Sequence, residues 1–137
     1  MRYDLKRFKD AQERVYEKAL KEIRNGHKDT HWIWYIFPQL KGLGYSSTSN
    51  YYGITSKEEA EAYFNDPLLS ARLRQIAEAL LELEENDPVR VLGGIDAQKL
   101  QSSMTLFDQI SGHDVFEKVL DKFYRGERDR RTLEMLK

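Results

Sequence analysis

The chain has 137 residues, of which 40% are hydrophobic and 12% aromatic, and this is enough apolar material for one folded domain spanning 1–137. Its 22 Lys and Arg residues nearly balance its 23 Asp and Glu residues, so the overall charge gives no strong attraction to nucleic acid or to an anionic membrane. It contains no Cys, which excludes disulfides, thiolate metal sites and Cys nucleophiles.

No segment predicts a membrane span or a secretory signal. The longest apolar run, residues 32–38, is too short to cross a bilayer. The first ten residues, MRYDLKRFKD, are polar and lack the apolar stretch of a signal peptide. We therefore expect a cytoplasmic protein.

The first predicted element is a helix over residues 4–25. Apolar residues recur there at steps of three and four, while Lys, Arg and Glu fill the opposite side. Asp4 is the expected N-cap, and Gly26 is the expected stop.

The next run, THWIWYIFPQL at residues 30–40, is apolar on all sides and is therefore expected to be buried. We predict a short helix that Thr30 caps and that ends near Phe37. Pro38 disfavours helical geometry at the residue before it, which sets that end. A buried strand is the alternative.

Residues 41–56 are dense in Gly, Ser, Thr and Asn and predict one long loop. A loop of this length with little structure of its own is uncommon and is often functional. The segment is therefore of interest for function as well as for fold.

Clear start signals mark the later helices. Ser56 and Glu59 form a capping box, and Asp-Pro pairs begin at Asp66 and Asp87. The predicted segments are 57–65, 67–85, a short turn ending at Gly93–Gly94, 97–111, 115–125 and the last turns from 129 to 137. The sequence thus predicts an all-α array of six or seven helices with one long Gly/Ser-rich loop.

The first candidate site is the aromatic run around His31. Trp32 or Trp34 could stack on a nucleobase or a similar flat ring. His31 is the candidate general acid or base, because the unperturbed pKa of histidine lies near neutrality. The alternative is that the aromatic residues form the core and that His31 is structural.

Two further segments carry groups suited to a ligand. Glycines let the backbone approach a ligand, and polar side chains can bind phosphate or ribose. The candidates are Gln39, Gly42, Gly44, Ser46, Ser47, Ser49 and Asn50 in the loop, and Lys99, Ser102 and Ser103 in the helix 97–111. The alternatives are a plain surface loop and close packing of the helix.

Familiar catalytic and metal motifs are absent from the sequence. Its histidines are His27, His31 and His113, and they form no HExxH or Cys/His metal spacing. There is no GxSxG elbow, no GxGxxG pattern and no Lys at Walker spacing. We therefore expect no metal and no cofactor.

Five segments form a specific combination: DLKRFKDAQERVYEKAL, HWIWYIFPQLKGLG, YYGI, KLQSSMTLF and KFYRGERDRRTLEML. This combination resembles the bacterial family known as domain of unknown function 1810, over roughly Asp4 to Leu136. The resemblance implies a single-domain, mainly helical protein and supplies no mechanism. Some members carry the label calpastatin, but calpastatin's inhibitory repeats are disordered until bound, whereas this chain has a patterned core and helix caps throughout.

Two segments, AQERVYEKAL and KFYRGERDRRTLEML, are also similar to NADAR domains, which are linked to ADP-ribose and NAD-derived metabolites. We hypothesise a site for a nucleotide or ADP-ribose-like small molecule where the aromatic helix, the loop and the helix 97–111 meet. Trp32 or Trp34 is then expected to contact residues 99–105. Whether the protein is an enzyme stays open. The alternative is a protein-interaction module with no catalytic activity, whose partner the sequence does not identify.

Overall fold

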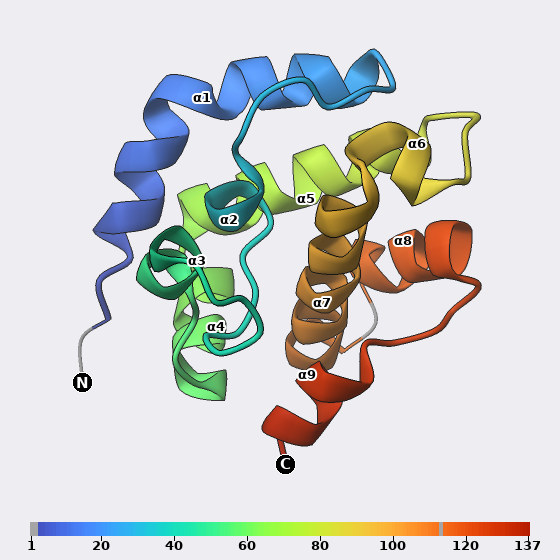
Figure 1. Ribbon diagram of the computed structural model, residues 1–137. Helices are drawn as coiled ribbons and strands as arrows, with labels where there is room; N and C mark the ends of the chain where they lie inside the picture. Colours follow the sequence, from blue (N-terminus) through green and yellow to red (C-terminus); the bar gives the residue numbers. More distant parts are fainter. Residues whose placement is uncertain (1–2, 113) are drawn as a thin grey trace.

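The computed structural model describes residues 3–112 and 114–137, and most of them are helical (Figure 1). His113, named above, lies outside the described residues. Nine helices occur in this part of the chain: α1 (Lys6–Arg24), α2 (Ile33–Ile36), α3 (Ser47–Tyr52), α4 (Lys57–Asn65), α5 (Pro67–Leu81), α6 (Pro88–Leu92), α7 (Gly94–Ser111), α8 (Val115–Tyr124) and α9 (Arg130–Met135).

The all-α prediction is confirmed, but the predicted number of six or seven helices is wrong, because the described part of the chain holds nine. The predicted long Gly/Ser-rich loop is also not found, since α3 lies within residues 41–56. Ser46 caps this helix by accepting a hydrogen bond from the Ser49 N–H at 3.0 Å. Residues 47–52 contain no Gly or Pro, so nothing in their sequence prevents the short helix that Ser46 caps.

Helix starts marked by Asp-Pro pairs lie where the sequence predicts them. The Asp66 carboxylate accepts hydrogen bonds from the backbone N–H groups of Leu68 and Leu69 at the start of α5. Asp87 does the same for Val89 at the start of α6. Asp4, in contrast, does not cap α1: the N-cap position belongs to Leu5, which makes no side-chain cap hydrogen bond.

Between α2 and α4 the chain makes one isolated parallel β-bridge, which pairs Leu40 with Ile54. The Lys41 N–H donates to the Ile54 carbonyl at 2.8 Å, and the Ile54 N–H donates to the Gln39 carbonyl at 2.9 Å. The bridge closes the base of the segment that carries α3. It therefore holds the two ends of this segment together.

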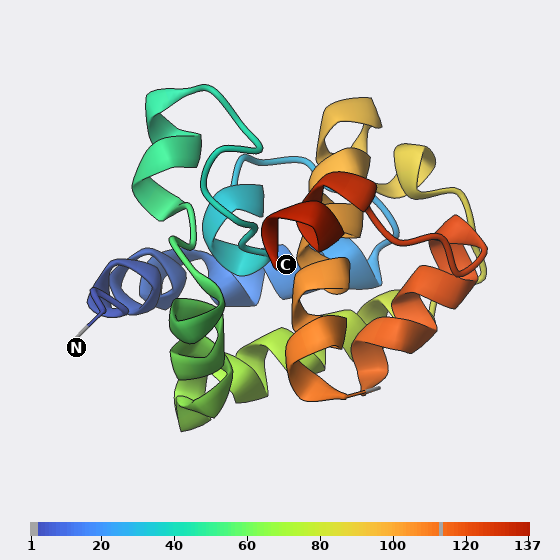
Figure 2. The ribbon, with the colours of Figure 1, turned by 90° about the horizontal axis from the view of Figure 1, so that it is seen from below.

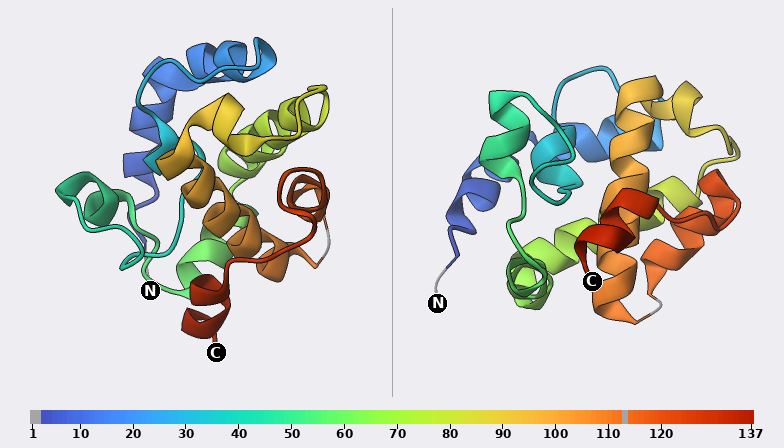
Figure 3. Two further views of the ribbon diagram at one scale, coloured as in Figure 1. Left: turned by 45° about the vertical axis from the view of Figure 1, so that its right-hand side comes forward. Right: turned by 60° about the horizontal axis from the view of Figure 1, so that its bottom comes forward.

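Helix α7 passes through the middle of the fold and packs against α2, α4, α6, α8 and α9. It separates α2 and α3 on one side from α8 on the other (Figures 1 and 3). The fully buried ring of Phe107 joins α4 to α8, with its centroid 5.3 Å from that of Tyr63 and 5.8 Å from that of Phe116. Burying one such ring stabilises the fold by about 1.5–3 kcal/mol.

Helix α9 lies across α7 (Figure 2). The carboxylate of Asp129, its N-cap, accepts hydrogen bonds from the Thr132 N–H at 3.1 Å and from Ser102 Oγ of α7 at 3.0 Å. One carboxylate thus both begins α9 and attaches it to α7.

Candidate functional site

Trp32 is a core residue in this structure. Its side chain is fully buried, and its indole N–H donates to Glu22 Oε1 at 2.9 Å. The ammonium of Lys28 lies 4.9 Å from the centroid of its ring. Trp32 therefore offers no exposed ring face to a ligand.

The carboxylate of Glu22 organises the turn between α1 and α2. Besides the indole, it accepts hydrogen bonds from the Asp29 N–H at 2.7 Å, the Thr30 N–H at 3.0 Å and the Thr30 hydroxyl at 2.6 Å. Burial raises the pKa of Glu22, but the hydrogen bonds from Thr30, Trp32 and Asp29 outweigh it and hold the pKa at about 2. The hydrogen bonds to this carboxylate therefore hold the turn in place.

The other two aromatic-run candidates are more accessible. His31 is exposed, and its carbonyl accepts a hydrogen bond from the Tyr35 hydroxyl at 3.3 Å. Trp34 is half-buried and packs against the core. Helix α2 packs against α7, but a direct contact of Trp32 or Trp34 with residues 99–105 stays a prediction.

The hydroxyl groups of α7 serve the packing of α9. Ser102 donates to the Asp129 carboxylate, and Thr105 Oγ1 accepts from the Asp129 N–H at 2.9 Å. Ser103 is fully buried, and its hydroxyl has no hydrogen-bond partner in the described part of the chain. Lys99 is half-buried on the same helix. Close packing of α7 thus explains Ser102 and Thr105.

The loop before α3 packs tightly on that helix. A Cβ at Gly44 would lie 2.5 Å from Ser49 Oγ and 3.4 Å from Nε2 of the buried Gln39, so only glycine fits. Gly42 contacts α9 instead, where Arg131 donates to its carbonyl at 3.4 Å. The exposed members of the predicted loop set are Gly42, Ser46, Ser47 and Asn50.

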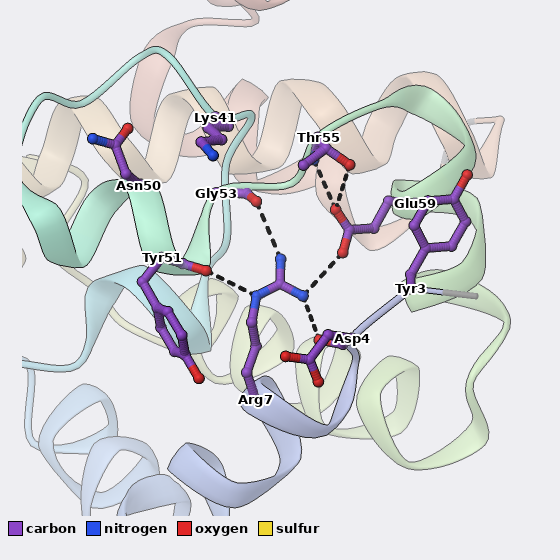
Figure 4. Close-up of a pocket in the computed structure, with 9 residues that line it drawn as sticks. All are labelled: Tyr3, Asp4, Arg7, Lys41, Asn50, Tyr51, Gly53, Thr55 and Glu59. Atoms are coloured by element: carbon purple, nitrogen blue, oxygen red, sulfur yellow. Dashed lines mark hydrogen bonds and ion pairs between the residues drawn. The ribbon is translucent and has the colours of Figure 1, made fainter. Parts of the chain in front are cut away.

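A hollow of about 300 Å³ opens where the segment before α1 meets the bridge region, α3 and the start of α4 (Figure 4). Its lining combines aromatic, basic, acidic and amide groups. The lining residues are Tyr3, Asp4, Arg7, Lys41, Asn50, Tyr51, Gly53, Thr55 and Glu59. Asn50 is the sequence-predicted candidate among them.

The guanidinium of Arg7 forms the floor of this hollow. It donates to the carbonyls of Tyr51 at 2.9 Å, of Gly53 at 3.1 Å and of Asp4, and to Glu59 Oε2 at 3.0 Å. The side chains of Arg7 and Glu59 are only 7% and 3% exposed. Removing either partner would leave a buried charge uncompensated, so the pair is a fixed part of the structure.

Glu59 is itself held by residues just before α4. Its Oε1 accepts hydrogen bonds from the Thr55 N–H at 2.7 Å and from the Thr55 hydroxyl at 2.9 Å. The Ser56 hydroxyl accepts from the Glu59 N–H at 3.1 Å, as a capping box requires. The carboxylate, however, binds Thr55 and Arg7. The residue that the sequence predicts as part of a capping box is therefore also part of a buried ion pair.

Lys41 stands at the rim of the hollow in a fixed position. A Cβ at Gly53 would lie 2.6 Å from both Cα and Cβ of Lys41, so only glycine allows the two segments to approach. The Lys41 side chain is exposed, and within residues 3–112 and 114–137 its ammonium makes no hydrogen bond or ion pair. The backbone of Lys41 is thus held by Gly53, and its exposed ammonium is available to a ligand.

Aromatic rings continue from the hollow across the surface. Tyr51 is 59% exposed, and its ring meets that of Tyr52 edge-on at 4.8 Å. Tyr52 in turn lies 5.1 Å from Tyr35 of α2. The rim of the hollow is therefore connected to the aromatic run that the sequence analysis singled out.

The described residues contain neither a candidate metal site nor a helix that could cross a membrane. No group of three or more His, Asp or Glu side chains is placed to hold a metal ion. No helix in the same residues has the length and apolar character needed to cross a membrane.

Comparison with known proteins gives a family and a fold. A family model described as "Protein of unknown function (DUF1810)" matches residues 2–136. The crystal structure of the conserved hypothetical protein Rv1873 from Mycobacterium tuberculosis is 42% identical and superposes with a TM-score of 0.95, covering 98% of this chain and 96% of that chain. None of the curated proteins searched matches the chain.

Proposed function

This chain belongs to the DUF1810 family, and we propose that it binds a nucleotide or ADP-ribose-like small molecule in the hollow lined by Arg7, Lys41 and Asn50. The observation that carries this proposal is the ammonium of Lys41. Among the described lining residues, the other cation, Arg7, already donates to Glu59 and to backbone carbonyls. Lys41 is left to bind a phosphate group.

The remaining lining residues suit the other parts of such a ligand. The exposed ring of Tyr51 can contact a base or a sugar, and the Asn50 side chain can both donate to and accept from ribose hydroxyl groups. Because the close approach of Gly53 to Lys41 fixes the backbone of the rim in advance, a ligand would have to order only the exposed side chains there.

The proposal concerns binding and assigns no catalytic group. His31, the sequence-predicted acid or base, is not among the residues that line the hollow. Trp34, Gln39, Gly42, Gly44 and Lys99 are likewise outside its lining. A small-molecule site remains the hypothesis, with Lys41 at its rim as the phosphate-binding group.

The rival interpretation, a protein-interaction module, has less support. The most exposed large apolar side chains are Tyr45, Tyr51, Leu68, Val89, Ile95 and Met135. Each comes from a different element, namely the loop before α3 and helices α3, α5, α6, α7 and α9. The hollow, in contrast, gathers its polar groups in one place.

Isothermal titration calorimetry with AMP, ADP-ribose and adenosine tests the proposal. We expect the two phosphate-bearing ligands to bind and adenosine to bind more weakly. Lys41→Met should weaken AMP binding roughly ten- to a hundredfold, the value of one charge-assisted hydrogen bond. Lys18→Met, which removes an exposed lysine of α1, is the control and should leave AMP binding unchanged.

Two results would overturn the proposal. If AMP and ADP-ribose give no heat of binding at millimolar concentration, the interaction module becomes the better hypothesis. If they bind equally well to the wild type and to Lys41→Met, the ligand site lies elsewhere.

A further inference from the structure

The side chain of Arg7 is only 7% exposed and contacts a buried ring as well as the hollow. Its Cζ lies 4.3 Å from the centroid of the fully buried Phe8 ring. Its edges are occupied by the carbonyls of Asp4, Tyr51 and Gly53 and by the carboxylate of Glu59. Arg7 nevertheless lines the hollow, and Figure 4 shows its guanidinium in the middle of the other lining residues.

A planar cation with most of its donors satisfied, here four of the five N–H groups, is a surface on which a flat ring stacks. Guanidinium groups stack on aromatic rings and on nucleobases, as proteins that bind single-stranded RNA show. Here the ion pair with Glu59 balances the charge, so the stacked ring need not be anionic. A ligand ring over Arg7 would complete a stack of Phe8, guanidinium and ring.

Two charges of opposite sign lie on opposite sides of this guanidinium in Figure 4, Lys41 on one side and Asp4 on the other. No hydrogen bond or ion pair to the Asp4 carboxylate is found among the described residues, although its backbone carbonyl binds Arg7. An ionised carboxylate only accepts hydrogen bonds, and an ammonium only donates them. The hollow therefore favours a ligand with a donor at one end and an anion at the other.

Resting on the proposed function, we infer that the hollow selects nucleotides whose base carries an exocyclic amino group, as adenine and cytosine do. The base stacks on Arg7, the amino group donates to Asp4, and the phosphate accepts from Lys41. In adenine nucleotides the amino group and the phosphate-bearing sugar lie at opposite ends of the base, which matches the placement of Asp4 and Lys41. Hypoxanthine and uracil present an oxygen acceptor at that position, which the Asp4 carboxylate repels.

The test compares AMP with IMP and CMP with UMP by calorimetry, since each pair differs by an amino group against an oxo group. The wild type should bind the amino-bearing member at least about tenfold more tightly, because the amino group donates to the charged Asp4 acceptor whereas the oxo group is repelled by it. In Asp4→Asn the preference should fall to within about threefold, because an amide can donate as well as accept. Only the backbone carbonyl of Asp4 serves the fold, and circular dichroism should show Asp4→Asn folded.

Glu17→Gln, which neutralises an exposed carboxylate elsewhere on α1, is the matched control and should keep the wild-type preference. Ribose 5-phosphate carries the phosphate without a base and should bind at least about tenfold more weakly than AMP, since stacking contributes roughly 1–3 kcal/mol per base. AMP, but not ribose 5-phosphate, should also shift the side-chain ¹⁵N–¹H signal of Arg7 Nε.

The possible outcomes distinguish the choice of base and its stacking from nucleotide binding itself. Equal affinity for AMP and IMP in the wild type overturns the amino-group selection while nucleotide binding stands. Equal affinity for AMP and ribose 5-phosphate, with an unmoved Arg7 signal, overturns the stacking. Absence of binding by every nucleotide overturns the proposed function itself.

Discussion

Two buried glutamates, Glu22 of α1 and Glu59 of α4, bind a threonine in the same way, but only Glu59 lies beside a hollow. Each carboxylate accepts hydrogen bonds from both the backbone N–H and the hydroxyl of one threonine, Thr30 for Glu22 and Thr55 for Glu59. The remaining partners differ. Glu22 accepts from the Asp29 N–H and from the buried indole of Trp32, whereas Glu59 pairs with the Arg7 guanidinium at the floor of a hollow.

The difference shows that a glutamate–threonine arrangement fixes a turn but does not determine whether a site forms beside it. At Glu22 the partner ring, Trp32, is fully buried, and no ligand can reach it. At Glu59 the same arrangement fixes a cation, and the lining also includes Lys41 and Asp4, whose side chains make no hydrogen bond or ion pair among the described residues. These two available side chains distinguish the candidate site.

The largest expected effect comes from removing the acid beside the hollow. Glu59→Ala should lower the free energy of unfolding by about 3–5 kcal/mol, because it leaves the buried Arg7 guanidinium without its counter-charge. Urea denaturation followed by circular dichroism measures this. Exposed Glu17→Ala serves as the reference and should change stability by less than about 0.5 kcal/mol. A loss below about 1 kcal/mol for Glu59→Ala would show that water replaces the carboxylate and that the floor is not rigid.

A smaller effect is expected at Glu22, and it should depend on pH. The pKa of this carboxyl is about 2 in the fold and 4.5 as a free group, so the folded state favours the ionised form. Its contribution to stability should therefore be complete above about pH 4.5 and be lost as the pH falls toward 2.

Urea midpoints of the wild type and Glu22→Gln, measured from pH 7 to pH 2.5, test this. The variant should be less stable by about 1–3 kcal/mol at pH 7, and the gap should narrow below pH 4.5. A gap that stays constant over this range would contradict the lowered pKa.

The smallest effects are expected from removing the two threonine hydroxyls. These variants compare the turn at Glu22 with the hollow at Glu59 most directly. Thr30→Val and Thr55→Val should each cost about 0.5–1.5 kcal/mol, the net value of one hydrogen bond. Only Thr55→Val should also weaken AMP binding, because Thr55 holds Glu59 and through it the Arg7 floor. Thermal unfolding and calorimetry on both variants measure the two quantities. Equal AMP affinities in the two variants would mean that the Glu59 side does not serve the hollow.

The fold could be predicted where the signal is local. The starts of α5 and α6 follow from Asp66 and Asp87, because each carboxylate caps an N–H only two residues ahead. Asp4 carries the same signal, but its backbone carbonyl binds the Arg7 guanidinium and α1 begins later, at Lys6. Helix α3 is not predicted from the sequence, because the composition of residues 41–56 as a whole is typical of a loop.

The candidate site could be predicted only in part. Asn50 was selected because it lies in a Gly/Ser-rich segment, which is a local property of the sequence. Arg7 and Glu59 are 52 residues apart, and charged residues on amphipathic helices normally face water, so no spacing indicates that they pair. The aromatic run was expected to be apolar and buried, and Trp32 is, but its hydrogen bond to Glu22 depends on how the turn folds back on α1.

The bonds made by Arg7 also determine when the hollow can exist during folding. They join residue 7 to residues 51, 53 and 59, at sequence separations of 44, 46 and 52. Closing loops of this length has an entropic cost that contacts within a helix do not have, so the hollow should assemble after α1 and α4 have formed. A ligand bound there would therefore stabilise the completed fold against global unfolding, and not one helix alone.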